Sequence, residues 1–208
     1  MKQIDIPDAD SPARTSRDEA REATRRRLVE AALKVTERSG LDKLTLEAVA
    51  AEAGVSKGGL LYHFSSKQRL VTAMLEDMSA TFLREFDKAI GAEPNSVGRS
   101  CRAYVTASLT KIRAGRWAGL FAGALADREL LGVLTGGVTP SLSTWRRLDE
   151  AEGLDPTIGA TCRMAIDGLW IWVMLGQVDT VDENHDVVEH VLRMLDEAAV
   201  HDKAAVHD

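Results

Sequence analysis

The sequence predicts an all-α fold divided into two helical domains. Apolar residues recur three and four positions apart along most of the 208-residue chain, which is the period of a helix with one buried face. One such series predicts a long helix from Ser66 or Lys67 to Ile90, where Gly91 and Pro94 end it. Neither the alternation typical of half-buried strands nor an internal repeat is visible in the sequence.

Two short helices joined by a three-residue turn are predicted between Thr45 and Lys67. Thr45 is a suitable N-cap for the first helix, Gly54 supplies the left-handed residue that ends it, and Ser56 caps the second. Such a pair forms a helix-turn-helix, whose second helix lies in the major groove of DNA. The side chains expected on the inner faces are Leu46, Val49, Ala50, Ala53, Leu60 and Phe64.

A corner of this kind also occurs as a purely structural unit, but the residues on its outer surface favour DNA. Gly58 and Gly59 each cost about 1 kcal/mol against alanine in a helix, so we expect a close approach to base edges or to another backbone. The remaining exposed side chains are of the hydrogen-bonding and cationic types that hold phosphate oxygens. They are Ser56, Lys57, Tyr62, His63, Ser66 and Lys67.

Residues 24–70 resemble the DNA-binding domain of the TetR family of bacterial transcription regulators. The matching residues are Ala31, Ala32, Gly40, the Thr45 to Ala53 helix, Gly54-Val55-Ser56-Lys57, Leu60, Tyr62-His63-Phe64 and Ser66-Lys67. The resemblance implies base contacts from Lys57, Gly58, Gly59 and Leu61, and phosphate contacts from Thr45, Ser56, Tyr62, His63 and Lys67. The sequence departs from the family at Gly59, where Thr, Ser or Ala is frequent, and at Leu61, where Tyr is frequent. We therefore expect apolar contact at Leu61, for example with a thymine methyl, and more reliance on DNA shape.

The net charge of −6 is unevenly distributed along the chain. Residues 11–70 contain 12 Lys and Arg against 8 Asp and Glu, whereas residues 71–208 contain 13 against 21. The cationic excess therefore coincides with the predicted DNA-binding domain. Residues 1–20 are expected to form a disordered arm, which is either a solvated tail or a segment whose Arg14 and Arg17 enter a minor groove.

The first helix of the DNA-binding domain is expected at about residues 21–39. Three arginines at positions 25–27 lie near its start, where they oppose the helix dipole. Two partners would balance these charges equally well. One is a DNA phosphate, and the other is the pair of carboxylates Glu22 and Glu30 on neighbouring turns.

The expected domains are a DNA-binding domain at 21–66, a helical regulatory and dimerisation domain at 67–200, and a polar tail at 201–208. Within the second domain, Thr139-Pro140 and Asp155-Pro156 each have the pattern of an N-cap followed by proline at the first helical position. Helices are expected near residues 96–113, 117–134 with a break, 140–152, 156–177 and 185–200.

Two of these helices carry an unusually large apolar surface. The helix that begins at Pro156 is apolar almost all round between Met164 and Leu175, and such a helix must be covered on several sides. The resemblance implies that it pairs, together with the last helix, with a second copy of the chain in a four-helix bundle. The alternative is that the same surface is filled within one subunit. The stripe on the last helix consists of Val187, Val188, Val191, Leu192 and Leu195.

The resemblance also implies a pocket for a small ligand in the second domain. A carboxylate in an apolar helix must be paired, hydrogen-bonded or in water. Asp167 is therefore expected to cap a helix, to bond across a dimer, or to meet a cationic or hydroxylated ligand. Taken singly, most of the candidate lining residues also suit an ordinary core. These candidates are Tyr104, Phe121, Trp145, Met164, Asp167 and Trp170.

Other classes of protein have little support in the sequence. Cys101 and Cys162 form no CxxC-type pair, so we expect no disulfide framework, metal site or cofactor, and a reducing cytoplasm. The first ten residues lack the apolar region of a signal peptide, and no stretch reaches the roughly 18 apolar residues of a membrane helix. No phosphate loop, GxGxxG pattern or nucleophile elbow indicates an enzyme.

We therefore expect a cytoplasmic, homodimeric repressor that binds a near-palindromic operator and is released by a small apolar or amphipathic inducer. One alternative is a DNA-binding regulator of the same fold that has no small-molecule inducer or acts as an activator. A second alternative, from another class, is an all-helical binding protein or enzyme with a vestigial helix-turn-helix.

Overall fold

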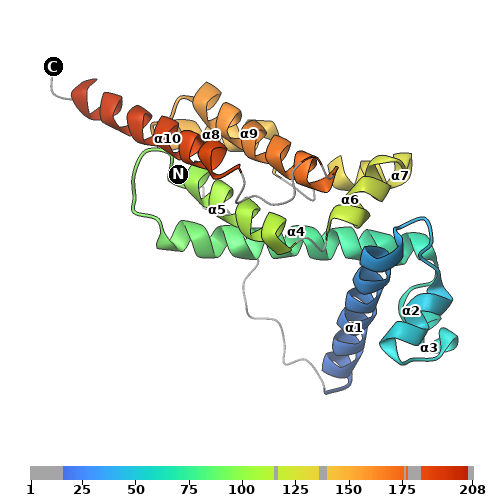
Figure 1. Ribbon diagram of the computed structural model, residues 1–208. Helices are drawn as coiled ribbons and strands as arrows, with labels where there is room; N and C mark the ends of the chain where they lie inside the picture. Colours follow the sequence, from blue (N-terminus) through green and yellow to red (C-terminus); the bar gives the residue numbers. More distant parts are fainter. Residues whose placement is uncertain (1–15, 115–116, 136–139, 176, 178–183, 206–208) are drawn as a thin grey trace.

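The computed structural model describes residues 16–114, 117–135, 140–175, 177 and 184–205. These residues contain ten α-helices and no strand, which confirms the predicted all-α fold (Figure 1). Within the same residues, no helix combines the length and the apolar character needed to cross a membrane. The helices are α1 (Ser16–Ser39), α2 (Leu46–Ala53), α3 (Lys57–His63), α4 (Lys67–Ala92), α5 (Arg99–Ala114), α6 (Ala118–Leu125), α7 (Arg128–Thr135), α8 (Leu142–Ala151), α9 (Pro156–Met174) and α10 (His185–Ala205).

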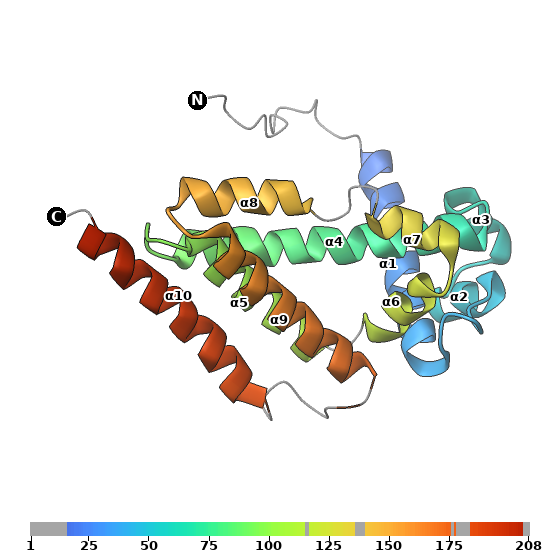
Figure 2. The same ribbon diagram turned by 90° about the horizontal axis from the view of Figure 1, so that it is seen from above.

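The long helix α4 runs through the molecule and connects its two ends (Figures 1 and 2). Near its N-terminal end α4 packs on α1, and α2 and α3 lie beside α1 at that end of the molecule. Farther along, α5 packs on α4, α9 packs on both α5 and α8, and α10 packs on α9. The helix-turn-helix therefore lies at one end of the molecule, and the C-terminal end of α10 lies at the other.

The buried apolar side chains form two main cores. The first core contains residues of α1 to α4, among them Leu28, Val49 and Leu60, and continues into α6 and α7 through residues such as Leu120 and Leu130. The second core joins α5, α9 and α10. Helices α6 and α7 thus pack with the helices of the predicted DNA-binding domain, although they follow them by about fifty residues in the sequence.

The stripe predicted for dimerisation on the last helix is used largely within the subunit. Val191 and Leu195 are buried in the second core. These two residues therefore follow the alternative prediction, in which the apolar surface is covered within one subunit. Val187, at the start of α10, is exposed. Large apolar side chains are exposed at the C-terminal end of α9: Trp172 is 58% exposed, and Leu175, which follows the last residue of the helix, is 63% exposed. Periodicity identified the buried face of α10 correctly, but not the helices that cover it.

Helix α1 includes the last five residues of the predicted arm at 1–20. Helix α1 begins at Ser16 rather than near residue 21, so Arg17 is part of α1. Residues 1–15, which include Arg14, lie outside the described residues. Two acidic residues in the first turn of α1, Asp18 and Glu19, favour this earlier start because they complement the helix dipole.

An N-cap followed by proline at the first helical position was predicted for two helices, and only one of these predictions is confirmed. At α9 the prediction is confirmed, because the Asp155 carboxylate accepts a hydrogen bond from the Thr157 amide and Pro156 is the first helical residue. At α8 the prediction is wrong: Ser141 is the N-cap, so Pro140 precedes the cap. Thr139 lies outside the described residues. At the C-terminus, α10 continues to Ala205, into the predicted polar tail.

Candidate DNA-binding surface and ligand cavity

Local hydrogen bonds fix both helices of the helix-turn-helix. The hydroxyl oxygen of Thr45 accepts from the Ala48 amide at 3.1 Å, and that of Ser56 accepts from the Gly59 amide at 3.0 Å. Gly54 ends α2 with a left-handed φ of 66°. Each capping hydroxyl accepts through its oxygen and keeps its own proton, which it can donate to a phosphate oxygen. The caps are therefore compatible with the predicted phosphate contacts of Thr45 and Ser56.

The outer face of α3 is open to solvent. Tyr62 is 70% exposed and Leu61 is 39% exposed. The Lys57 ammonium lies 2.5 Å from the Glu47 carboxylate, but both side chains are more than half exposed, so water weakens this ion pair and leaves Lys57 available for DNA. The Arg21 guanidinium lies 5.5 Å from the centre of the Tyr62 ring and extends the cationic surface onto α1.

The two adjacent glycines of α3 have different surroundings. A Cβ at Gly59 would lie 3.3 Å from the Ser56 hydroxyl that caps the same helix, so the fold itself favours glycine there. A Cβ at Gly58 would lie 3.9 Å from the same hydroxyl. Apart from the backbone of its own helix and its chain neighbours, it would meet no other atom within 4 Å. Nothing within the described residues therefore explains Gly58, which supports the expectation that an external surface approaches it closely.

His63 lies partly buried beside Tyr62, with the two rings edge to face at 5.2 Å. Burial lowers the pKa of His63 below its usual value, and the nearby Arg21 and Arg25 lower it further. The imidazole is therefore neutral at neutral pH. In a phosphate contact, His63 would donate through a ring N–H.

Lys67, the first residue of α4, joins this helix to the loop between α1 and α2. Its ammonium donates to the carbonyl oxygen of Leu41 at 2.9 Å and lies 3.3 Å from that of Asp42. An ammonium group has three donors, so one N–H is left for a phosphate. Lys67, for which a phosphate contact is predicted, therefore also holds the start of α4 against the loop between α1 and α2.

We expect Lys67→Ala to weaken binding to all duplex sequences alike. The slope of log affinity against log salt concentration should fall by about 1, because one phosphate contact is lost. Fluorescence anisotropy at several salt concentrations measures this slope. Lys88→Ala, at an exposed position near the far end of the same helix, is the control and should leave the slope unchanged. An unchanged slope in Lys67→Ala would remove Lys67 from the phosphate contacts.

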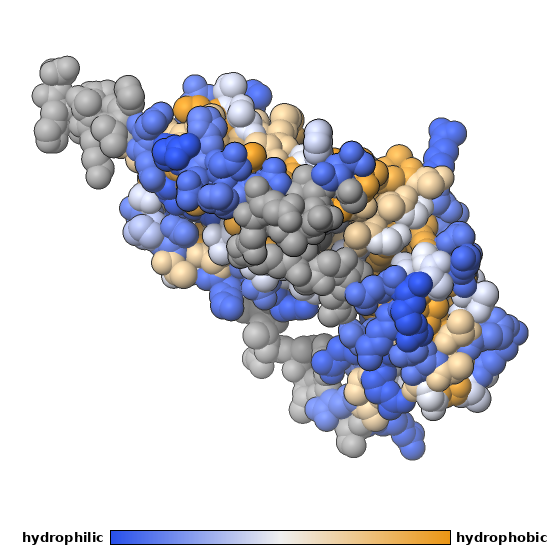
Figure 3. Space-filling model, in the orientation of Figure 1, coloured by the Kyte–Doolittle hydropathy of each residue, from blue (hydrophilic) through white to orange (hydrophobic). Residues whose placement is uncertain are grey.

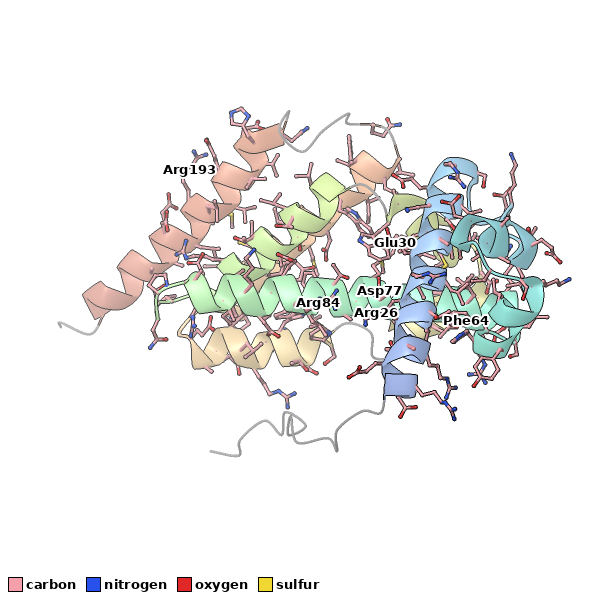
Figure 4. All side chains as sticks on the ribbon, turned by 90° about the horizontal axis from the view of Figure 1, so that it is seen from below. Arg26, Glu30, Phe64, Asp77, Arg84 and Arg193 are labelled. Atoms are coloured by element: carbon pink, nitrogen blue, oxygen red, sulfur yellow. The ribbon has the colours of Figure 1, made fainter. Side chains whose placement is uncertain are left out.

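The arginines near the start of α1 have partners within the protein. Arg25 lies 4.0 Å from the Glu22 carboxylate and 3.6 Å from that of Glu76 on α4. Figure 4 shows Arg26 and Asp77 where α1 crosses α4. Arg25 therefore pairs with carboxylates of the protein itself, which is one of the two predicted alternatives; the other is a DNA phosphate.

Behind the helix-turn-helix, the described residues surround a cavity of about 480 Å³. Helices α4, α5, α8 and α9 supply most of its wall, and α6, α7 and Pro140 before α8 supply the rest. A cavity of this size suits a drug-sized molecule. The structure brings all six predicted lining residues to this cavity: Tyr104, Phe121, Trp145, Met164, Asp167 and Trp170.

Five of the described lining residues are aromatic, and they contact one another. The Tyr104 ring lies edge to face with Phe82 at 5.4 Å and with Trp145 at 5.3 Å. The Phe121 and Trp170 rings lie 4.2 Å apart, also edge to face. Contacts of this kind hold the rings in defined positions, because the positive edge of one ring meets the negative face of the next.

Asp167 is hydrogen-bonded within its own subunit. The Tyr104 hydroxyl donates to its carboxylate at 2.6 Å. Burial raises the pKa of Tyr104 far above its usual value, and the neighbouring carboxylate raises it further, so the phenol remains a donor at physiological pH. Asp167 lies at the solvent-exposed side of the cavity, as do Met164 and Ile171, which are 63% and 39% exposed. The bond to Tyr104 was not among the roles expected for Asp167.

Comparison with known protein families also indicates a DNA-binding protein with a helix-turn-helix. Residues 28–74 match the family "Bacterial regulatory proteins, tetR family", and residues 98–196 match the family "Tetracyclin repressor-like, C-terminal domain". The two matches take in the helix-turn-helix and most of the helices that line the cavity. The chain belongs to the TetR family. TetR-family proteins are DNA-binding transcription regulators rather than enzymes.

Individual TetR-type relatives agree with this assignment. TtgW, an HTH-type transcriptional regulator of Pseudomonas putida, is 34% identical over 100 residues, which cover 48% of this chain and 70% of TtgW. SrpR of Pseudomonas putida is 34% identical over 100 residues, 48% of this chain and 44% of SrpR. Among solved structures, the multidrug binding protein EbrR complexed with malachite green is 26% identical, with a TM-score of 0.61 over 82% of this chain and 97% of EbrR.

Sequence reasoning missed a buried ion pair beside the TetR-family cavity. Arg163 of α9 makes two hydrogen bonds to the Asp149 carboxylate of α8, one of them at 2.9 Å, and both residues are buried. The Arg163 guanidinium also lies 5.3 Å from the centre of the Trp145 ring. A Cβ at Gly159 would overlap the Asp149 carboxylate, so α8 and α9 can approach only at a glycine. An arginine four residues after a glycine in an apolar helix was the available signal.

Proposed function

We propose that this protein is a dimeric repressor that a small ligand releases from a near-palindromic operator. Each subunit would place α3 in a major groove, with the two α3 helices about 34 to 36 Å apart or slightly more. The position of α6 is the observation that supports release of the DNA by a ligand. This helix lines the cavity and also packs in the same core as the DNA-binding helices.

Helix α6 offers a direct route from the cavity to the DNA-binding domain. Its Phe121 faces the cavity, and its Gly123 lies against Leu41 in the loop between α1 and α2. The carbonyl of Leu41 is in turn held by Lys67 at the start of α4. A ligand that displaces Phe121 would therefore act on the contacts that orient both α1 and α4.

The proposed release is a shift between two populations of the dimer. A ligand that favours the conformation with badly spaced α3 helices by about 1 to 3 kcal/mol would weaken operator binding by about 5- to 150-fold. EbrR, which has a similar fold, is described as a multidrug binding protein and was solved with malachite green. That description supports a ligand role for the cavity of this chain.

Helix α9 is the proposed centre of the dimer. Gly168 and Trp172 lie on one face of α9, and Leu175, directly after the helix, continues this spacing; Trp172 and Leu175 are exposed. A Cβ at Gly168 would meet no atom of the described subunit within 4 Å, which leaves room for a second helix. Figure 3 shows apolar surface over the C-terminal part of α9, whereas hydrophilic surface prevails over α1. An exposed apolar face of this kind favours association with a second copy.

We expect Trp172→Glu to convert the dimer into a monomer, because it places a charge in the proposed apolar interface. Light scattering after size-exclusion chromatography gives the mass directly. Leu83→Glu on α4 is the matched control, because Leu83 is also exposed, at 40%, but lies on another helix. It should remain dimeric. A dimeric Trp172→Glu protein would move the interface away from this face of α9.

Two measurements test the proposed function as a whole. Band shifts with fragments from upstream of the protein's own gene should reveal a specific duplex that two chains bind. Thermal shifts with a set of metabolites and drugs should then identify compounds that stabilise the protein, and those compounds should release the duplex. Specific binding that no stabilising compound reverses would favour a regulator without an inducer. Absence of binding at low salt would refute the DNA-binding role.

We expect Gly123→Ala to weaken operator binding without abolishing ligand binding. The added methyl would lie 2.6 Å from the Leu41 Cβ, so α6 and the α1–α2 loop must separate, at a cost of about 1 to 3 kcal/mol. Gly132→Ala in α7 is the control, because a Cβ there meets nothing within 4 Å. Anisotropy with the operator and calorimetry with a ligand measure the two affinities. Unchanged operator affinity and unchanged release in Gly123→Ala would rule out the route through Leu41.

A further inference from the structure

Two carboxylates lie in the helix-turn-helix, and they pair with different helices. Glu47 and Glu52 are the acidic residues of the segment from residue 45 to residue 67. The Glu52 carboxylate, near the end of α2, lies 2.7 Å from the guanidinium of Arg38 in the last turn of α1. The Glu47 carboxylate, in the first turn of α2, lies 2.5 Å from the ammonium of Lys57 at the start of α3. Of the two, Glu47 is therefore the one paired with the helix that is proposed to enter the major groove.

The pair of Glu47 and Lys57 contributes little to the fold. Both side chains are more than half exposed, and an exposed ion pair has little effect on stability. Helices α2 and α3 are joined instead by buried apolar side chains such as Val49 and Leu60. The first turn of α2 favours an acidic residue because of the helix dipole, but the dipole does not require its carboxylate to reach α3. Fold stability therefore does not explain why a carboxylate lies beside Lys57.

The carboxylate of Glu47 is charged and lies next to the expected DNA contacts. The hydrogen bond with Lys57 lowers the pKa of Glu47 below its usual value, and a hydrogen bond with its own backbone lowers it further, so Glu47 is ionised at neutral pH. Thr45, two residues before it, is an expected phosphate ligand. Gly58, next to Lys57, is the position where a close approach of DNA is expected. A duplex that reaches Lys57 therefore also meets a negative charge.

A neighbouring carboxylate changes which acceptors Lys57 prefers. A phosphate is anionic, so Glu47 repels it, and an ammonium that is already paired releases less counterion when it contacts a phosphate. The edge of a guanine is neutral, and its O6 and N7 atoms accept hydrogen bonds from lysine. An ammonium has three donors, so Lys57 can donate to a guanine while it keeps its bond to Glu47. The ion pair thus reduces the gain from a phosphate contact and preserves the gain from a guanine contact.

We propose that Glu47 is a specificity-determining residue, which directs Lys57 toward a guanine of the operator and away from phosphates. On random DNA nearly all contacts are to phosphates, so the pair keeps Lys57 from adding to the affinity. On the operator, Lys57 contributes through a base edge. The inference rests on the proposed placement of α3 in the major groove, and it adds a side chain of α2 to the readout of the sequence.

Glu47→Gln tests this role, because it removes the charge and keeps the size of the side chain. Fluorescence anisotropy gives the affinity for two duplexes of equal length, one that the wild type selects from a random pool and one of random sequence. We expect the affinity for the random duplex to rise about fivefold, and the slope of log affinity against log salt concentration to steepen by about 1, because Lys57 becomes free to contact a phosphate. The affinity for the selected duplex should change by less than about twofold, so the ratio of the two affinities falls.

Glu52→Gln is the matched control, because it removes the same charge from the same helix but from a pair with α1. It should leave the ratio of the two affinities unchanged, and thermal melting checks that both variants are folded. The double substitution Glu47→Gln with Lys57→Met tests whether the effect passes through Lys57. Its salt slope on the random duplex should equal that of Lys57→Met alone, since no ammonium is left to release.

An unchanged affinity ratio in Glu47→Gln, or a change equal to that in Glu52→Gln, would overturn the inference. A salt slope that still steepens in the Lys57→Met background would overturn it as well.

Failure of the inference differs from failure of the proposed function. If the inference alone is wrong, Gly58→Glu still abolishes binding to the selected duplex, and the affinity ratio in Glu47→Gln stays at the wild-type value. If α3 does not enter the groove, the folded Gly58→Glu protein keeps its affinity. If the wild type selects no duplex from the pool, the proposed operator binding is refuted, and the inference is refuted with it.

Discussion

Gly58→Glu is expected to abolish DNA binding while the protein remains folded. A side chain at this position meets only the Ser56 hydroxyl, so α3 can accommodate it, and replacing glycine raises the helix propensity of α3. The glutamate would, however, place bulk and negative charge where the start of α3 is proposed to approach base edges and phosphates. We expect the affinity for a selected operator duplex to fall by at least about 100-fold, measured by fluorescence anisotropy.

Gly58→Ala separates the effect of charge from the effect of losing glycine. It should unfold at the same temperature as the wild type or slightly above it, and should lose less DNA affinity than Gly58→Glu. Circular dichroism melting checks that all three proteins are folded. Wild-type DNA affinity in a folded Gly58→Glu protein would mean that another surface reads the DNA.

Arg163→Met is expected to be the most destabilising single substitution considered. It leaves the Asp149 carboxylate fully buried between α8 and α9 without its partner. Removing one member of such a pair costs about 3 to 5 kcal/mol of unfolding free energy. Urea denaturation at a fixed protein concentration measures this cost, because the stability of the proposed dimer would depend on concentration.

The double substitution Asp149→Leu with Arg163→Met tests whether the lost pairing is the cause. With both charges removed, most of the stability should return, since a buried pair replaced by apolar groups of similar size is often neutral. A cost below about 1 kcal/mol in Arg163→Met alone would show that water reaches the Asp149 carboxylate.

The helix-turn-helix could be predicted closely because its signals are local. Thr45, Gly54 and Ser56 act within one turn of their own positions, so the sequence specifies where α2 ends and α3 begins. The second role of Lys67 was not visible. Its bonds to the Leu41 and Asp42 carbonyls join residues 25 and 26 positions apart, and spacing along the chain carries no information about such contacts.

The cavity could be predicted only in part, for a similar reason. The sequence contains few aromatic residues, so most of the aromatic lining residues could be named from the sequence alone. The structure also places Phe82 of α4 in the cavity wall, and Phe82 is not among the predicted lining residues. The pair of Asp149 and Arg163 was missed because it depends on how α8 crosses α9. Periodicity shows that Val191 is buried, but not that α9 rather than a partner subunit covers it.

The stoichiometry of the DNA complex tests the central claim most directly. Purified protein titrated onto an operator-length duplex in dilute salt, with the mass followed by light scattering, should form a complex of two chains per duplex. Protection of the duplex should then fall into two patches about one helical turn apart. A protein that stays monomeric and leaves the duplex unbound under the same conditions would contradict the account.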